Sequence, residues 1–203
     1  MMSRTKLVTI IAVTVFISVI CSSCKENKVS TPLLDDGNNY TGFSNISQDY
    51  NAADAAADGC LVINTVQGTN KYGATVTEKR ETAGYENWQG FLEKARSGRD
   101  AFLRIAHFID GVGYYHDLHY CDGKYIIFDY NENGVSKGAE FQYLRRLDGY
   151  SGPATDPKEN CFYVLTDSME LTYDDVNRSF LSSDLSTVTD IPFEWLGFMV
   201  FFE

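Results

Sequence analysis

The sequence predicts a single α+β domain, with a mainly antiparallel sheet and two or three helices packed on one of its faces. Three observations lead to this fold class. The centre of the chain is a run of aromatic-rich segments separated by short turns, which favours sequential antiparallel strands. Residues 85–97 have clear helical periodicity. The 13 Tyr and 13 Phe residues are more than an acidic disordered chain would carry, so the chain is expected to bury a core.

The first 23 residues are predicted to be an export signal and not part of the fold. A positively charged start is followed by the uncharged run Leu7–Cys21, which is short for a membrane-spanning helix. Ser22 and Ser23 then precede Cys24, which is the pattern of a bacterial lipoprotein signal. We therefore expect Cys24 to be the acylated first residue of the mature chain, anchored in the cell membrane on its extracytoplasmic face. Plain secretion with a coincidental cysteine is the alternative.

Residues 24–46 are predicted to form a flexible tether, because they are polar and have no clear periodicity, and residues 47–203 are predicted to form the globular domain. The Ala-rich segment 47–58 is expected to be a short helix capped by Ser47. An apolar strand over 60–65 follows, and 71–82 is either an edge strand or a loop. The helix over 85–97 has its apolar residues at the i, i+3, i+4 and i+7 spacing of one buried stripe: Trp88, Phe91, Leu92 and Ala95.

The second half of the domain is predicted to be mostly strands. Asp122-Gly123 separates two aromatic-rich segments, and this pair is a strong indicator of a tight hairpin turn. Thr172, followed by Asp174 and Asp175, indicates a helix start, with the helix continuing through Leu181. The predicted strands are 101–109, 114–120, 124–130, 140–147, 161–166 and 195–202.

A series of short motifs runs through these segments: Ala55-Ala56, Gly59 with Leu61-Val62-Ile63, Phe91, Arg104-Ile105, Asp117-Leu118 with Tyr120, Asp122-Gly123-Lys124, and Asp129. In these motifs the chain resembles a domain of unknown function found in small lipoproteins of Gram-positive bacteria. The resemblance covers about residues 53–150, and the chain departs from it by extra residues between Gly68 and Tyr85 and by its tail after Gly152. The resemblance implies a similar fold and an anchored envelope location. It brings no activity, substrate or catalytic residue.

One group of residues has the chemical character of a site: His107, His116, Asp117, His119, Cys121 and Asp122. Imidazole, thiolate and carboxylate groups together are typical Zn²⁺ ligands. Residues an odd number apart on a strand face opposite sides, so His116 and His119 cannot meet without a bulge. Asp117, His119 and Cys121 share a face. His107 on the neighbouring strand could act as a further ligand only if it lies on that same face. We therefore expect no catalytic residue, no cofactor and no metal, with His119, Cys121 and His107 as weak metal candidates.

The remaining cysteines, Cys60, Cys121 and Cys161, lie beside β-branched or aromatic residues. They are expected to be small buried apolar side chains, with one disulfide and one spare thiol as the alternative in an oxidising compartment.

Charge limits the function. The chain has 28 acidic and 17 basic residues and a net charge of −11, which argues against binding of nucleic acid and favours a cationic partner. The predicted function is a membrane-anchored, non-enzymatic binding module for a protein, peptide or envelope component. The alternative is an envelope hydrolase or a metal-dependent enzyme whose site is not visible in the sequence.

Overall fold

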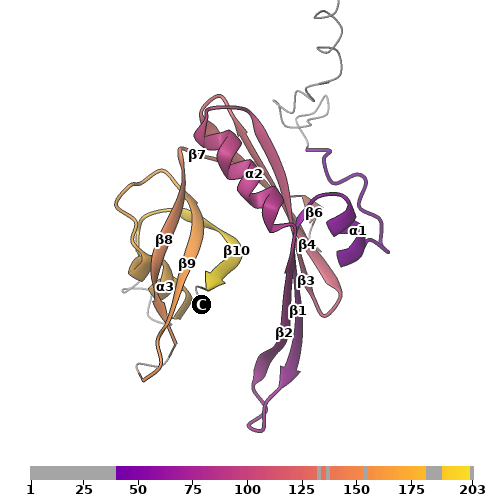
Figure 1. Cartoon of the computed structure of the whole chain (residues 1–203), viewed down its shortest axis with the longest axis vertical. Helices are drawn as coiled ribbons and strands as arrows, with labels where there is room; N and C mark the ends of the chain where they lie inside the picture. The colour runs from indigo at the N-terminus through magenta and orange to yellow at the C-terminus, as the bar shows by residue number, and fades with distance from the viewer. Residues whose placement is uncertain (1–39, 132–133, 136–137, 153–154, 182–188, 202–203) are drawn as a thin grey trace, which may run out of the picture.

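The structure is a computed structural model that describes residues 40–131, 134–135, 138–152, 155–181 and 189–201. In these residues the chain forms helices and two sheets, and the predicted α+β fold class is confirmed (Figure 1). The helices are α1 (Ala52–Ala57), α2 (Tyr85–Arg96) and α3 (Tyr173–Leu181). The strands are β1 (Leu61–Thr69), β2 (Thr75–Ala83), β3 (Ala101–Ile109), β4 (Val112–Cys121), β5 (Lys124–Asn131), β6 (Gly134–Val135), β7 (Ala139–Phe141), β8 (Tyr143–Ser151), β9 (Lys158–Thr166) and β10 (Phe193–Phe201).

The larger sheet has seven strands, in the order β2-β1-β3-β4-β5-β6, with β7 also pairing with β5. All of its strand pairs are antiparallel except β1 with β3, because the chain crosses over through β2 and α2 between them. The segment 71–82, predicted as an edge strand or a loop, contains the edge strand β2, which is exposed along its whole length.

The smaller sheet has three antiparallel strands, in the order β10-β9-β8. The single strand predicted over 140–147 is wrong, since these residues belong to two strands in different sheets. Strand β7 pairs with β5 in the larger sheet, and β8 pairs with β9 in the smaller one. The chain passes from one sheet to the other at Gln142, whose backbone N–H donates to Asp167 Oδ1 at 2.8 Å.

The predicted hairpin turn between β4 and β5 is confirmed. Asp122 and Gly123 both have positive φ, 51° and 77°. This is the conformation that a two-residue type I′ turn requires, and Asp-Gly adopts it at little cost. The turn fixes the register in which Tyr120 pairs with Tyr125 and His116 with Asp129.

The larger sheet has two covered faces, which we call inner and outer. The inner face carries Leu61, Ile63, Leu103 and Ile105 and packs against the smaller sheet. Helix α2 lies on this face, and its predicted apolar stripe is confirmed, since Trp88, Phe91, Leu92 and Ala95 are all buried. The outer face carries Val62, Ala106, Phe108, Tyr115 and Phe128.

The sequence analysis expected the helices to pack on one face of the sheet. In the structure the three helices lie on different faces. Helix α1 contributes Ala55 to the core of the outer face, whereas α2 packs on the inner face. Helix α3 packs Val176 against the far side of the smaller sheet, onto Phe162 and Val164. Successive residues of β1 and β3 are apolar and buried, so both faces of the larger sheet are apolar and each face needs its own cover.

Two predicted helix starts have different outcomes. Helix α1 is capped by Asn51 and not by Ser47: the Asn51 side chain accepts from the backbone N–H groups of Ala53 and Asp54. Helix α3 begins after Thr172, as predicted. The Thr172 hydroxyl accepts from the backbone N–H of Asp175 at 3.2 Å, and Asp175 Oδ2 accepts from the backbone N–H of Thr172 at 2.9 Å.

Packing starts earlier in the chain than predicted. Tyr40 and Phe43, which the sequence analysis placed in the tether, are buried in the core of the outer face. The boundary expected at Ser47 is therefore too late. The predicted signal peptide, Cys24 and the rest of the tether lie outside the described residues.

Candidate functional site

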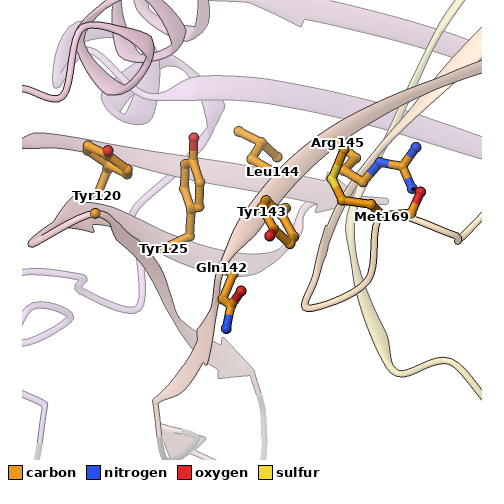
Figure 2. Close-up of a pocket in the computed structure, with 8 residues that line it drawn as sticks. Tyr120, Tyr125, Gln142, Tyr143, Leu144, Arg145 and Met169 are labelled. Atoms are coloured by element: carbon orange, nitrogen blue, oxygen red, sulfur yellow. Dashed lines mark hydrogen bonds between the residues drawn. The ribbon is translucent and has the colours of Figure 1, made fainter.

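A groove opens on the inner face where the tip of the β4–β5 hairpin meets the start of β8. It has a volume of about 240 Å³. Figure 2 shows the side chains of Tyr120, Tyr125 and Tyr143 around it, together with Leu144 and Met169. The rings of Tyr120 and Tyr125 are a cross-strand pair with centroids 4.9 Å apart and planes inclined at 52°. We call this the tyrosine groove.

Arg145 also lines the tyrosine groove, and its guanidinium is used in holding one wall in place. Its Nη1 donates to the backbone carbonyl oxygens of Met169 at 2.8 Å and of Leu171 at 2.7 Å. These bonds fix the loop between β9 and α3, which carries Met169. The Met169 side chain is 62% exposed, so this wall presents a flexible apolar group to solvent.

Acidic side chains also lie at the tip of the hairpin, around Cys121 on the outer face, the side of the sheet opposite to the groove. Burial raises the pKa of the Cys121 thiol, and the neighbouring carboxylates of Asp122, Asp100 and Glu140 raise it further. Glu140 also accepts from Lys124 Nζ at 2.9 Å in an exposed ion pair. On the inner face, burial raises the pKa of Tyr125, and the charge of Arg96 on α2 acts against this rise.

A second, buried polar cluster lies on the outer face. Arg104 and Asp117 are a cross-strand pair, and Asp117 is 0% exposed. Arg104 Nε donates to Asp117 Oδ1 at 2.6 Å, and Arg104 Nη2 donates to Asp117 Oδ2 at 2.7 Å. The Tyr40 hydroxyl donates to the same Oδ2 at 2.6 Å. Because that proton is directed at Asp117, His119 Nε2, 3.1 Å from the hydroxyl, acts as a donor to it.

The segment 40–45 closes over this cluster. Arg104 Nη2 donates to the Gly42 carbonyl oxygen at 2.7 Å, Nη1 donates to Asn45 Oδ1 at 3.2 Å, and the guanidinium lies over the ring of Phe43. Burial raises the pKa of Tyr40 and lowers that of His119 to about 4. Arg104 and Asp117, the charged groups of this cluster, are paired with each other. Its arrangement is that of a structural latch for the start of the domain, which we call the Tyr40 latch.

A third cluster lies at the end of the inner face opposite to the tyrosine groove. The His107 and His116 rings lie edge to face with centroids 5.3 Å apart. His116 Nδ1 is 2.6 Å from Asp129 Oδ1, and His107 Nε2 is 3.2 Å from the carbonyl oxygen of Leu196 on β10. Burial, and then the charge of His116, lowers the pKa of His107 to about 3. Burial, and then Asp129, raises the pKa of Glu194.

The structure does not bring the three weak metal candidates together. His119 and Cys121 lie on the outer face of β4, as the alternation predicted, but His107 lies on the inner face and cannot join them. His119 contacts Tyr40 and Phe102. In the part of the chain that the structure describes, no group of three or more His, Cys, Asp and Glu side chains is arranged to hold a metal ion.

The cysteines of the domain can be compared with the expectation, whereas the predicted lipid anchor lies outside the described residues. The part of the chain that the structure describes has three buried cysteines that form no disulfide: Cys60, Cys121 and Cys161. This agrees with the expectation that they are small buried apolar side chains. Among the described residues, no helix is long and apolar enough to cross a membrane.

Comparison with known proteins adds no function: no family model, no curated protein and no solved structure matches the chain. The resemblance to the lipoprotein domain therefore stays a prediction. The tyrosine groove was missed in the sequence, because its walls come from two sheets. The predicted hairpin at Asp122-Gly123 placed only Tyr120 and Tyr125 of the groove side by side.

Proposed function

We propose that this protein is a lipid-anchored binding module on the extracytoplasmic face of the cell membrane, and that its tyrosine groove holds a cationic side chain of a protein or peptide partner. The observation that carries the proposal is the groove itself, which three tyrosine side chains line at the tip of the β4–β5 hairpin. Tyrosine is among the residues that contribute most energy at binding interfaces, because it combines a large apolar ring with a polar end.

The size of the groove favours a side chain over a whole small-molecule substrate. Pockets that enclose such substrates usually have volumes of about 300–1,000 Å³. At about 240 Å³ the tyrosine groove is below that range. A lysine or arginine side chain places an apolar stem and a terminal charge in such a space, with the charge near the faces of the rings.

The net charge of the chain favours a cation over an anion. The one cationic group in the lining is Arg145, and its guanidinium is already engaged with backbone carbonyl oxygens. Arg96 on α2 acts electrostatically on Tyr125, whereas the whole chain has a net charge of −11. An anionic ligand would have to overcome this field.

A pocket that gathers His107, His119 and Cys121 would favour the enzyme alternative. These residues lie on two faces of the sheet, so this observation does not favour it.

Binding is tested with the chain from residue 24 onward carrying Cys24→Ser, so that it stays in solution. The probe is an octalysine peptide, with octaglutamate as the charge control, and affinity is measured by calorimetry. Tyr125→Ala should weaken octalysine binding about tenfold, which corresponds to the loss of one major contact. Tyr72→Ala is the matched control, because Tyr72 is 81% exposed at the tip of the β1–β2 hairpin, away from the groove. Equal affinities of the two variants would refute the groove as the binding site.

The anchor is tested separately in cells by Cys24→Ser in the full-length chain. The protein should move from the membrane fraction to the medium or stay unprocessed, since acyl chains are the expected attachment. Unchanged membrane association and processing would contradict the lipoprotein assignment and leave the groove unaffected.

A further inference from the structure

The two histidines on the inner face are each held by one ring nitrogen. A backbone carbonyl oxygen only accepts, so His107 Nε2 carries the proton that is donated to Leu196, and its Nδ1 keeps a lone pair. The Asp129 carboxylate likewise accepts from His116 Nδ1, so Nε2 is the ring nitrogen of His116 that has no hydrogen bond among the described residues. Among the described residues, none donates a hydrogen bond to either of these remaining nitrogens.

This is the arrangement that metal-binding histidines have in proteins. A histidine ligand almost always donates its other ring N–H to a carboxylate or a backbone carbonyl, which fixes the orientation of the ring. His116 has the carboxylate partner and His107 has the carbonyl partner. His119 has a different environment, because its Nε2 is used in the Tyr40 latch on the other face.

The separation of the two rings also fits a shared metal ion. With Zn–N bonds of about 2.0–2.1 Å, an imidazole centroid lies about 3.2 Å from the metal, and two such rings at the tetrahedral angle have centroids about 5.2 Å apart. The observed separation of the His107 and His116 centroids is 5.3 Å.

Carboxylates add negative charge beside the pair. Asp129 is bonded to His116, and Glu194, on β10 of the smaller sheet, interacts electrostatically with both Asp129 and His116. The positive charge of Arg80 on β2 counteracts this negative charge, since it also acts on His107. Gly197 lets β10 come close, because a Cβ at this position would lie 2.6 Å from His107 Cε1 and Nε2.

We propose that His107 Nδ1 and His116 Nε2 form a two-histidine site for Zn²⁺ or a similar divalent transition metal, with solvent completing the coordination. The site is independent of the tyrosine groove. With two protein ligands it is expected to bind in the micromolar range and to exchange readily. A bound ion would join β3 to β4, beside the hydrogen bond by which His107 reaches the Leu196 carbonyl of β10.

The test uses the chain from residue 24 with Cys24→Ser and without a polyhistidine tag. Zinc binding is measured by calorimetry, with magnesium as the control cation. One Zn²⁺ per chain is expected, and His107→Gln and His116→Gln should each weaken binding at least about tenfold, the effect of removing one ligand. His119→Gln is the matched control and should bind as wild type does. The sequence contains three histidines, so these variants cover all of them.

A second measurement decides the matter on the wild-type chain if a variant fails to fold. Nitrogen-15 spectra of the imidazole rings during a zinc titration should show changes at His107 Nδ1 and His116 Nε2 and none at His119. No binding by the wild type, unchanged zinc affinity in the double variant of His107 and His116, or a spectral change at His119 alone would each overturn the proposal.

Discussion

Replacing Tyr40 by Phe tests whether the Tyr40 latch stabilises the domain. The substitution keeps the ring, which stacks on Phe128 with centroids 4.0 Å apart, and removes the hydroxyl that donates to Asp117 at 2.6 Å. Asp117 is 0% exposed, so no solvent reaches it to replace that donor without rearrangement. A hydrogen bond to a charged group contributes about 1.5–3 kcal/mol. Asp117 keeps both bonds to Arg104, so the loss should not exceed this range.

The expected loss for Tyr40→Phe is therefore about 1.5–3 kcal/mol in the free energy of unfolding, or roughly 3–12 °C in melting temperature for a domain of this size. Tyr40→Ala should cost about 3–5 kcal/mol, since it also removes a buried aromatic ring. Urea unfolding followed by circular dichroism measures both. Tyr72→Phe is the control, because the Tyr72 side chain is 81% exposed and should change stability by less than about 0.5 kcal/mol.

The same reasoning applies to the start of the domain. A chain that begins at Ser47 lacks Tyr40, Phe43 and the contacts of Arg104 with Gly42 and Asn45. It should be much less stable than a chain that begins before Tyr40. The reasoning is refuted if Tyr40→Phe is as stable as wild type, or if truncation at Ser47 leaves the unfolding curve unchanged.

Two further predictions concern the core and its pH dependence. Phe91→Ala should cost about 3–5 kcal/mol on urea unfolding, because Phe91 is buried between α2 and the inner face, and a loss below about 1 kcal/mol would mean that this packing is wrong. Burial lowers the pKa of His119 to about 4, below the value near 6.5 of an unfolded chain, so the unfolded state binds more protons in this window. The contribution of His119 to stability is present above about pH 6.5 and is lost as the pH falls towards 4, by about 2 kcal/mol at pH 5. Urea unfolding of wild type and His119→Gln at pH 7, 6 and 5 measures the difference, and parallel pH profiles would contradict this assignment.

Local signals in the sequence predicted the elements whose formation depends on neighbouring residues. The buried stripe of α2, the turn at Asp122-Gly123 and the start of α3 at Thr172 are each encoded within a few residues, and each is confirmed. The turn also fixed the pairing of β4 with β5, which placed Tyr120 beside Tyr125.

Features that depend on contacts between distant segments were not predicted. Tyr40 and Phe43 are isolated apolar residues in a polar segment, and only their fit against Phe128 and Arg104 makes them part of the core. The alternation over 140–147 continues through Gln142, so periodicity alone does not show that the chain changes sheets there.

The histidines show the same limit more sharply. Strand alternation correctly separated His116 from His119, but it could not show that His107 meets His116. That contact depends on the register of β3 and β4, in which Ile105 lies opposite His116 and brings His107 to the diagonal position on the same face. The partner of His107, the Leu196 carbonyl, comes from a different sheet.

Both proposed sites depend on the packing of the two sheets, yet they should respond independently to mutation. His116 and Tyr120 lie on the same face of β4, with the fully buried Leu118 between them. Each site takes its second wall from a different part of the smaller sheet, the metal site from β10 and the tyrosine groove from β8. Substitutions at His116 should therefore leave octalysine binding unchanged, and Tyr125→Ala should leave zinc binding unchanged. Truncating Leu118 would separate the sheets at their centre and should weaken both, which distinguishes a local loss of a ligand from a general loss of the inner-face packing.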